Sequence, residues 1–287
     1  MAKEGIDSDG QRRWWLLTAP EAATGSDPVP LVLDFHGLSE GAEFHSGSTG
    51  WSELAEREGF VVAFPQGSGR SVGWDVRSSG PNPDLDFVDS MLADIEARYC
   101  IDTSRVYSTG LSNGAFLSSV LACTRPDVFA AVGPVAGVTY PPDCDPGKAV
   151  PVISFHGTAD PLLPFNGSVA ADALSSITSG GSGSTTSAPP GDIDGDGYPA
   201  NAADWAANNG CGQPTDEQVA GSVVRRSYDC PDGAEVVFYM IQDGGHTWPG
   251  SDALTAEGIA RIVGPTNMEI DATELTWEFF ARHQLAA

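Results

Sequence analysis

The chain has 287 residues, 41% of them hydrophobic, which is enough to build a sizeable core and argues against extensive disorder. Its formal net charge of −25 repels phosphate backbones, and no cluster of Lys and Arg reverses that field locally, so composition excludes a nucleic-acid partner. No apolar stretch approaches the length that spans a bilayer, which excludes a membrane-embedded protein.

Short apolar runs alternate along the chain with longer amphipathic stretches. This pattern is typical of parallel strands joined by crossover helices, and runs that are apolar at nearly every position indicate strands buried on both faces. The prediction is an α/β fold over 1–287, one domain with a mostly parallel, doubly wound sheet flanked by helices. The expected strands are 13–18, 31–36, 60–65, 106–110, 130–135, 150–156 and 236–242, and the expected helices are 51–58, 87–99, 115–123 and 272–283.

Residues 175–199 break this alternation, because they are rich in Ser, Thr, Gly and Pro and show no apolar periodicity. They indicate an inserted loop. Within it, Asp192, Asp194 and Asp196 precede a glycine as in the first half of a calcium-binding loop, but Ala203 stands where a bidentate Glu belongs. A structural calcium site and a solvated acidic turn both fit this segment.

Five cysteines occur without CxxC spacing or neighbouring histidines, which argues against zinc and favours disulfides. Cys211 and Cys230 flank a segment able to close as a hairpin, and Cys123 and Cys144 bracket one predicted strand, so we expect these two pairs. Cys100 is left over. Disulfides imply an oxidising compartment, so we expect a secreted or periplasmic protein whose signal peptide is absent from this sequence, with buried free cysteines as the alternative.

The segment 110–114 reads Gly-Leu-Ser-Asn-Gly, a G-x-S-x-G motif that follows a strand-like run and leads into a helical stretch. In that context the turn is strained and needs small residues on both sides of the serine, which it lifts toward solvent. The motif therefore predicts Ser112 as a nucleophile, with the start of the next helix favouring negative charge.

A serine nucleophile needs a histidine base and an acid that fixes the histidine's tautomer, here in chain order serine, acid, histidine. His246 fits, because it lies in a Gly- and Pro-rich loop just past a predicted strand. The other four histidines fit less well, since three precede any acid in this order and one lies in the C-terminal helix: His36, His45, His156 and His283.

Asp160 is the predicted acid, because it follows the apolar run 150–155 in a loop at the same rim of the sheet. Asp143 and Asp145 precede that strand, and Asp172 lies in a predicted helix, so these three compete less well. The oxyanion that forms on an acyl carbonyl requires two amide donors. Asn113, the residue after the nucleophile, and Leu38, which follows the His36-Gly37 turn, are expected to provide them.

Together these segments resemble the polyhydroxybutyrate depolymerase-like esterases, which include feruloyl esterases and acetylxylan esterases of carbohydrate esterase family 1. The resemblance covers most of the chain and is carried by Leu-Asp-Phe-His-Gly at 33–37, by 59–65, 99–102, 105–107, 110–114 and 156–160, and by Gly-Gly-His-Thr-Trp-Pro-Gly at 244–250. It implies an α/β-hydrolase fold, a serine esterase activity and triad roles for Ser112, Asp160 and His246. A cysteine often found after the His-Gly pair in the depolymerase branch is replaced here by Leu38.

Substrate choice follows less directly from the residues. Trp74 and Trp248 are expected to offer an aromatic platform for a phenolic acyl group or a sugar ring, whereas Trp205 is expected to pack a loop. We expect a monomeric carboxylester hydrolase that needs no cofactor and acts on feruloyl or related aromatic and short-chain esters of plant polysaccharide. Acetylated xylan, polyhydroxybutyrate oligomers, and a calcium-dependent binding module with a relic triad are the alternatives.

Overall fold

A computed structural model describes residues 1–8, 10–167 and 195–286. Ten strands form one sheet in the order β1-β2-β4-β3-β5-β6-β7-β10-β9-β8. The six central strands, from β4 to β10, are parallel, and an antiparallel pair closes each side. The strands are β1 Ala2–Ser8, β2 Gln11–Thr18, β3 Val29–Phe35, β4 Val61–Pro65, β5 Ile101–Leu111, β6 Ala131–Val135, β7 Val152–Gly157, β8 Pro214–Ala220, β9 Val223–Tyr228 and β10 Val236–Ile241.

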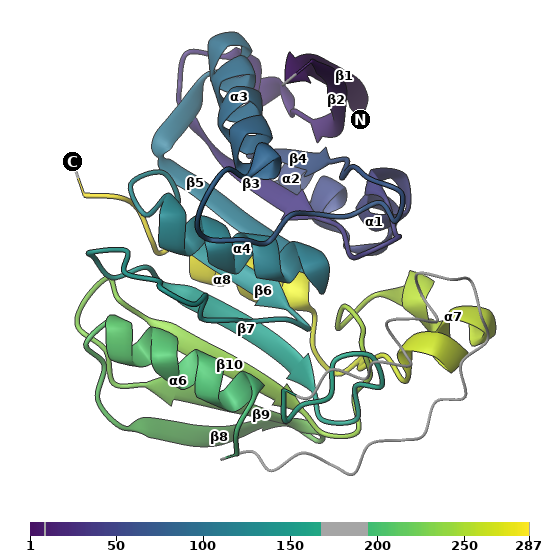
Figure 1. Cartoon of the computed structure of the whole chain (residues 1–287), viewed down its shortest axis with the longest axis vertical. Helices are drawn as coiled ribbons and strands as arrows, with labels where there is room; N and C mark the ends of the chain where they lie inside the picture. Colours follow the sequence, from purple (N-terminus) through teal and green to yellow (C-terminus); the bar gives the residue numbers. More distant parts are fainter. Residues whose placement is uncertain (9, 168–194, 287) are drawn as a thin grey trace.

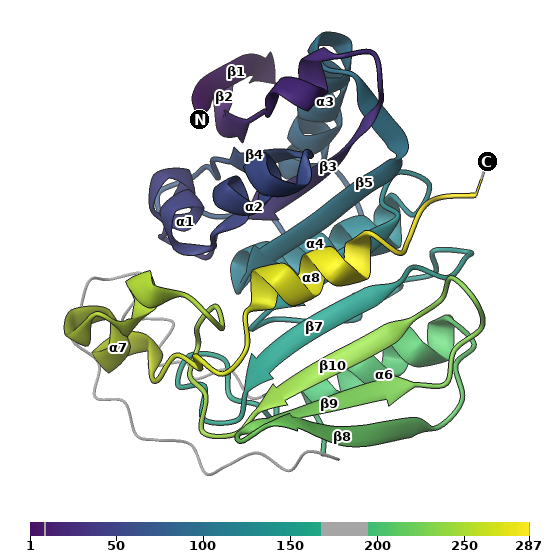
Figure 2. The ribbon, with the colours of Figure 1, turned by 180° about the vertical axis from the view of Figure 1, so that it is seen from behind.

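Helices cover both faces of this sheet. Figure 1 shows α3, α4 and α6 on one face, and Figure 2 shows α2 and α8 on the other, while α7 lies beyond the edge toward which the parallel strands point. The helices are α1 Ala42–Ser48, α2 Trp51–Glu58, α3 Pro83–Arg98, α4 Asn113–Thr124, α6 Tyr198–Asn208, α7 Glu257–Val263 and α8 Ala272–Phe280, with short 3₁₀ turns at η1 Glu21–Thr24 and η2 Asp252–Thr255.

Each face of the sheet has its own apolar core. Leu31 and Leu33 of β3 pack in the core beneath α3, α4 and α6, whereas Val32 between them packs in the core beneath α2 and α8. This alternation follows from the two-residue period of a strand, and it explains why the central strands are apolar at almost every position. The predicted mostly parallel, doubly wound sheet is confirmed.

All seven strands and all four helices predicted from the sequence occur, with ends that shift by up to five residues. The helix α3 starts four residues earlier than expected, because the Asn82 side chain caps it by accepting hydrogen bonds from the backbone N–H groups of Asp84 and Leu85. Within the described residues, three strands and three helices were not predicted: β1, β8, β9, α1, α6 and α7.

The expected loop at 175–199 lies mostly outside the described residues, as do Asp192 and Asp194. Its last two residues were assigned wrongly, because Tyr198 and Pro199 begin α6 and are buried against the core. A proline in the first turn of a helix costs no hydrogen bond, so Pro199 is compatible with this start. Asp196 is exposed.

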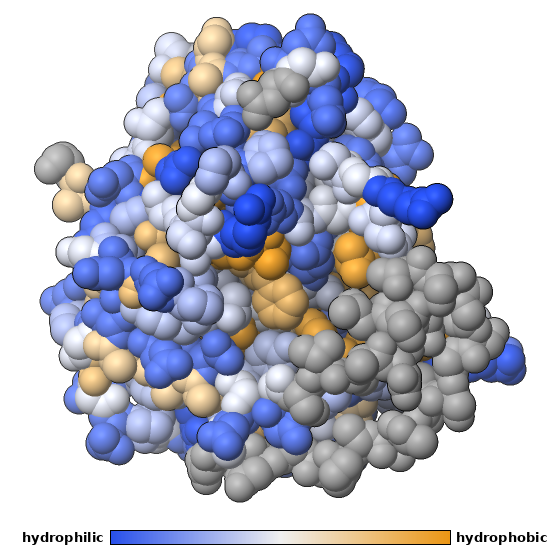
Figure 3. Space-filling model, viewed as in Figure 1, coloured by the Kyte–Doolittle hydropathy of each residue, from blue (hydrophilic) through white to orange (hydrophobic). Residues whose placement is uncertain are grey.

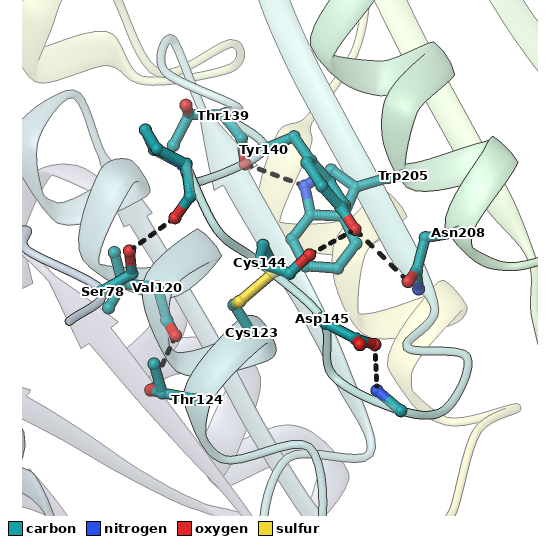
Figure 4. The surroundings of a disulfide bond; sticks show 12 residues. Ser78, Val120, Cys123, Thr124, Thr139, Tyr140, Cys144, Asp145, Trp205 and Asn208 are labelled. Atoms are coloured by element: carbon teal, nitrogen blue, oxygen red, sulfur yellow. Dashed lines mark hydrogen bonds between the residues drawn. A yellow bond between two sulfur atoms is a disulfide. The ribbon is translucent and has the colours of Figure 1, made fainter.

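Both expected disulfides are present. Cys123–Cys144 ties the end of α4 to the segment between β6 and β7, and Cys211–Cys230 closes the hairpin of β8 and β9, while Cys100 is free. Around the first bridge, Tyr140 donates to the carbonyl of Cys144 and its ring lies edge-on to Trp205 (Figure 4). None of the helices in the described ranges combines the length and apolar character that a membrane crossing requires.

Removing the Cys123–Cys144 bridge should lower stability, because it closes a loop with a sequence separation of 21 residues. The loop entropy regained by the unfolded chain predicts that Cys123→Ala with Cys144→Ala lowers the free energy of unfolding by about 3 kcal/mol, measured by urea denaturation. Cys100→Ala is the matched control and should change it by less than about 1 kcal/mol. Equal stability of the double variant and the control would contradict this account.

Candidate active site

The turn between β5 and α4 holds Ser112 in a backbone conformation that L-residues rarely adopt, with φ of 57° and ψ of −115°. Glycines on both sides make this turn possible. A Cβ on Gly114 would lie 2.0 Å from the carbonyl oxygen of Phe35, and one on Gly110 would lie 2.8 Å from the carbonyl carbon of Gly114. The half-buried Ser112 therefore stands at the tip of a tight strand-to-helix turn, as the motif predicts.

The loop after β3 runs directly beside this serine. A Cβ built on Gly37 would lie 3.5 Å from the Cβ of Ser112, so the Gly37–Leu38 peptide borders the serine side chain. The backbone N–H of Leu38 and that of Asn113, the first residue of α4, donate to no acceptor in the described part of the chain. Two unengaged amides beside one hydroxyl are what an oxyanion site requires.

Asp160 and His246 form a buried hydrogen-bonded pair. The distance from His246 Nδ1 to Asp160 Oδ2 is 2.7 Å, and the other carboxylate oxygen accepts from the N–H groups of Leu162 and Leu163, both at 2.8 Å. Burial alone would raise the pKa of the Asp160 carboxyl, but the charge of His246 and hydrogen bonding by His156 and His246 hold that pKa well below its usual range. Asp160 is therefore an anion able to fix the tautomer of His246.

Close backbone contacts bring the loops of these two residues together. A Cβ on Gly157 would lie 2.2 Å from the carbonyl oxygen of Gly244, and the Ala159 N–H donates to that same carbonyl at 3.0 Å. On the far side, His246 N–H donates to the carbonyl of Val263, the last residue of α7, at 2.6 Å. The His246 loop is thus held between the β7 loop and α7.

The other histidines have structural partners. His36 accepts from the Gly67 N–H at Nε2 and so carries its proton on Nδ1, which donates to the Gly37 carbonyl at 2.7 Å. Burial lowers the pKa of His36 to about 4, against the raising effect of that carbonyl bond, so the ring stays neutral. His156 stacks on Tyr198, and His283 contacts Glu235.

The expectation that Trp248 presents its ring to a substrate is wrong, because the ring is 1% exposed and its Nε1–H donates to Thr273. Trp74 is 7% exposed and lies against the active-site loops. Its Nε1–H donates to the carbonyl of His36, and its backbone N–H and carbonyl bond the side-chain amide of Asn113. Trp205 is fully buried and packs α6 on the core.

Sequence reasoning missed a buried charged cluster beside this site. His45 lies between two carboxylates, with Nε2 at 2.9 Å from Asp34 and Nδ1 at 3.1 Å from Glu40. Burial by itself lowers the pKa of His45, but the two anions raise it to about 10, so the ring is an imidazolium at neutral pH. The available signal was Asp34, an ionisable residue inside an apolar strand, which needs a partner.

In the described residues, no group of three or more His, Cys, Asp or Glu side chains lies close enough together to hold a metal ion. Asp192 and Asp194 lie outside the described residues, and Asp196 alone supplies no site.

The sheet, its helix layers and the serine turn at the carboxyl end of a central strand define the α/β-hydrolase class. The chain belongs to the esterase PHB depolymerase family, whose model matches residues 14–179. This is a family of carboxylic ester hydrolases, as the sequence predicted. The resemblance seen in the sequence is confirmed as well.

Among similar proteins, feruloyl esterase B of Piromyces equi is 27% identical over 80% of this chain, which spans 42% of the length of that protein. The putative esterase NocK of Nocardia uniformis is 28% identical to this chain, and the match covers 97% of this chain and 81% of NocK. Among solved structures, an acetyl xylan esterase from Aspergillus awamori matches with a TM-score of 0.61 at 18% identity, over 86% of this chain and 94% of that chain. The last comparison supports the α/β-hydrolase fold.

Asp160→Asn should leave the fold intact and lower kcat for ester hydrolysis by a factor on the order of 10³ to 10⁴. An amide in this position permits the wrong tautomer of His246 and no longer stabilises its protonated form. The control is Asp196→Asn, which alters an exposed carboxylate and should leave kcat unchanged. A kcat for Asp160→Asn within threefold of the unmodified enzyme would contradict the assignment.

The His45 cluster predicts how stability depends on pH. Because the folded-state pKa of His45 is raised to about 10, its contribution to stability is complete below the ordinary pKa of about 6.5 and is lost as pH rises through 10. The free energy of unfolding in urea should therefore fall between pH 7 and pH 9. His283→Asn should retain that slope and His45→Gln should flatten it, whereas a flat profile for the unmodified protein would contradict the charged state.

Proposed function

We propose that this chain hydrolyses carboxylic esters through an acyl-enzyme, with Ser112 as nucleophile, His246 as general base and Asp160 as the acid that orients His246. The observation that carries this proposal is the 2.7 Å bond between Asp160 and His246, at the sheet edge where the strained Ser112 turn also lies. The three side chains follow β5, β7 and β10, so the parallel order of these strands supports their convergence.

In the first half of the reaction, Ser112 Oγ attacks the ester carbonyl while His246 Nε2 takes the hydroxyl proton. The negative oxygen of the tetrahedral intermediate then accepts hydrogen bonds from the N–H groups of Leu38 and Asn113. The imidazolium of His246 gives its proton to the departing alcohol as the ester C–O bond breaks. Water attacks the acyl-enzyme in the second half, and the same proton transfers release the carboxylic acid.

Asp160 is suited to this role because its pKa lies well below its usual range, so the carboxylate stays charged at any working pH. It accepts the Nδ1–H of His246 and stabilises the imidazolium that forms in each half of the reaction. It is fully buried, which strengthens this interaction relative to one in water.

For the substrate, we propose feruloyl or related aromatic and short-chain esters of plant polysaccharide. Two observations support this choice: the first relative described above is named a feruloyl esterase, and apolar side chains gather in a hollow of the face that carries α4 (Figure 3). The burial of Trp248 means that this ring is not the platform for a phenolic group. Acetylated xylan and hydroxybutyrate oligomers are the alternative substrates, given relatives named for acetylxylan and polyhydroxyalkanoate hydrolysis.

We propose further that the enzyme works as a monomer without a cofactor in an extracellular or periplasmic setting. The two disulfides support an oxidising compartment. The acyl-transfer chemistry above uses only side chains and backbone amides of this chain.

The direct test is Ser112→Ala. This variant should lose hydrolysis of p-nitrophenyl acetate and labelling by a fluorophosphonate probe while keeping the circular dichroism spectrum of the unmodified protein. Ser119→Ala is the matched control, since it alters a buried serine elsewhere in α4 and should keep both activities.

If Ser112→Ala still hydrolyses the ester, the assignment of Ser112 as the nucleophile is wrong. Absence of labelling in the unmodified protein would instead favour a binding module with a relic triad. Comparison of kcat/KM for methyl ferulate, acetylated xylan and hydroxybutyrate oligomers then decides the substrate class.

A further inference from the structure

The peptide group that joins Gly37 to Leu38 is fixed through its carbonyl. The Gly37 oxygen accepts from His36 Nδ1–H at 2.7 Å and from the Glu40 N–H at 3.2 Å. Because a peptide group is planar, holding its C=O also sets the direction of its N–H, which belongs to Leu38. Donors on the carbonyl also polarise the group and make that N–H a better donor.

Glu40 holds the same loop from its other side. One carboxylate oxygen accepts the Gly37 N–H at 2.6 Å, and the other faces His45 Nδ1 at 3.1 Å. Burial by itself raises the pKa of Glu40, but His45 and the Gly37 N–H lower it below its usual value, so the group is an anion. With both oxygens engaged by donors, Glu40 is placed to brace the loop and not to exchange protons with a substrate.

The charge of His45 keeps this brace in place. His45 is fully buried, and its second nitrogen donates to Asp34, which also accepts from the Thr49 hydroxyl at 2.9 Å. A buried imidazolium between two carboxylates resists rotation, because turning the ring would leave an unpaired charge in the core. Through His45, Glu40 is therefore connected to Asp34 in β3. The loop that Glu40 supports begins where β3 ends.

The same cluster reaches the loop of the proposed general base. The ring of Trp248, two residues after His246, packs edge-on to His45 with centroids 5.8 Å apart. Its Nε1–H donates to Thr273, whose hydroxyl donates in turn to the carbonyl of Thr49. One buried network thus contacts both the oxyanion loop and the His246 loop.

We propose that Glu40 is a positioning residue that aims the Leu38 amide at the oxyanion, with His45 and Asp34 as the charged support that holds Glu40. This proposal rests on the esterase mechanism proposed above. It assigns the Glu40 side chain a part in transition-state stabilisation through the Gly37 N–H, which belongs to the His36–Gly37 peptide just before the Gly37–Leu38 peptide, with no contact to the substrate.

Glu40→Gln tests this role with little change of shape. A glutamine has one acceptor oxygen and one NH₂ donor, yet it would face two donors, so either the Gly37 N–H or the His45 ring loses its acceptor. Per active site counted by fluorophosphonate titration, kcat for p-nitrophenyl acetate should fall by about 10- to 100-fold, and KM should change by less than about threefold, since only the charged intermediate needs the amide. The Ki of a trifluoromethyl ketone, which forms an oxyanion on the serine, should rise by a similar factor.

Glu235→Gln is the matched control, because Glu235, like Glu40, contacts a histidine, here His283, and it lies just before β10, at the end of that strand away from the His246 loop. It should leave kcat and the inhibitor Ki unchanged. If Glu40→Gln does not fold, Glu40→Asp keeps the charge beside His45 while drawing the carboxylate back from the Gly37 N–H, and the same pattern is expected at smaller size.

A purely structural role would lower stability or the titrated fraction while leaving kcat per active site and Ki as in the unmodified enzyme, and that outcome would overturn the proposal. Failure of the underlying mechanism is distinguishable, because Ser112→Ala would then still turn over or the unmodified protein would not label.

Discussion

The close packing of α4 against the end of β3 determines where the proposed nucleophile and oxyanion donors lie. The carbonyl of Phe35 occupies the space that a side chain at position 114 would need, and the first turn of the helix rests on the last residue of the strand. Because β3 and β5 are neighbours in the sheet, this contact puts the loop after β3 beside the serine at the end of β5. The strained φ of Ser112 lies at this junction, together with the N–H groups of Leu38 and Asn113, which find no acceptor among the described residues.

A second set of contacts, between the loops that follow β7 and β10, positions the proposed acid and the proposed base. These two strands pair in parallel, and Gly157 and Gly244 allow their loops to touch backbone to backbone. The resulting pair of Asp160 and His246 is buried and anionic at the carboxylate, which suits it to hold one tautomer and to receive a proton on the other nitrogen. Rigid strands rather than side-chain flexibility thus set the geometry of the site.

The sequence predicted those parts of the fold in which a local pattern follows from the physical environment. Central strands are buried on both faces, so they appear as apolar runs, and the turn at Ser112 requires glycines that are visible in the sequence. The hairpin of β8 and β9 escaped strand assignment because β8, Pro214–Ala220, exposes nearly every side chain, so no alternation marks this edge strand. α6 was missed because its alanines and Pro199 adjoin a Gly- and Ser-rich segment that masked their helical pattern.

Local sequence patterns did not predict which way a side chain points or which residues it contacts. A tryptophan two residues after the proposed general base, His246, suggested a substrate platform, yet Trp248 turns into the core and packs on His45. The cluster of Asp34, Glu40 and His45 depends on how α1 packs over the end of β3. The periodicity of apolar residues along the sequence carries no information about that packing.

The central claim is that Ser112, His246 and two backbone amides act on one carbonyl carbon. A crystal structure of the protein after reaction with a phosphonate ester tests it most directly. The account predicts phosphorus bonded to Ser112 Oγ, with the phosphoryl oxygen within hydrogen-bond distance of both the Leu38 and the Asn113 nitrogens and His246 Nε2 facing Oγ. Phosphorus on another residue, or a phosphoryl oxygen directed away from both amides, would contradict it.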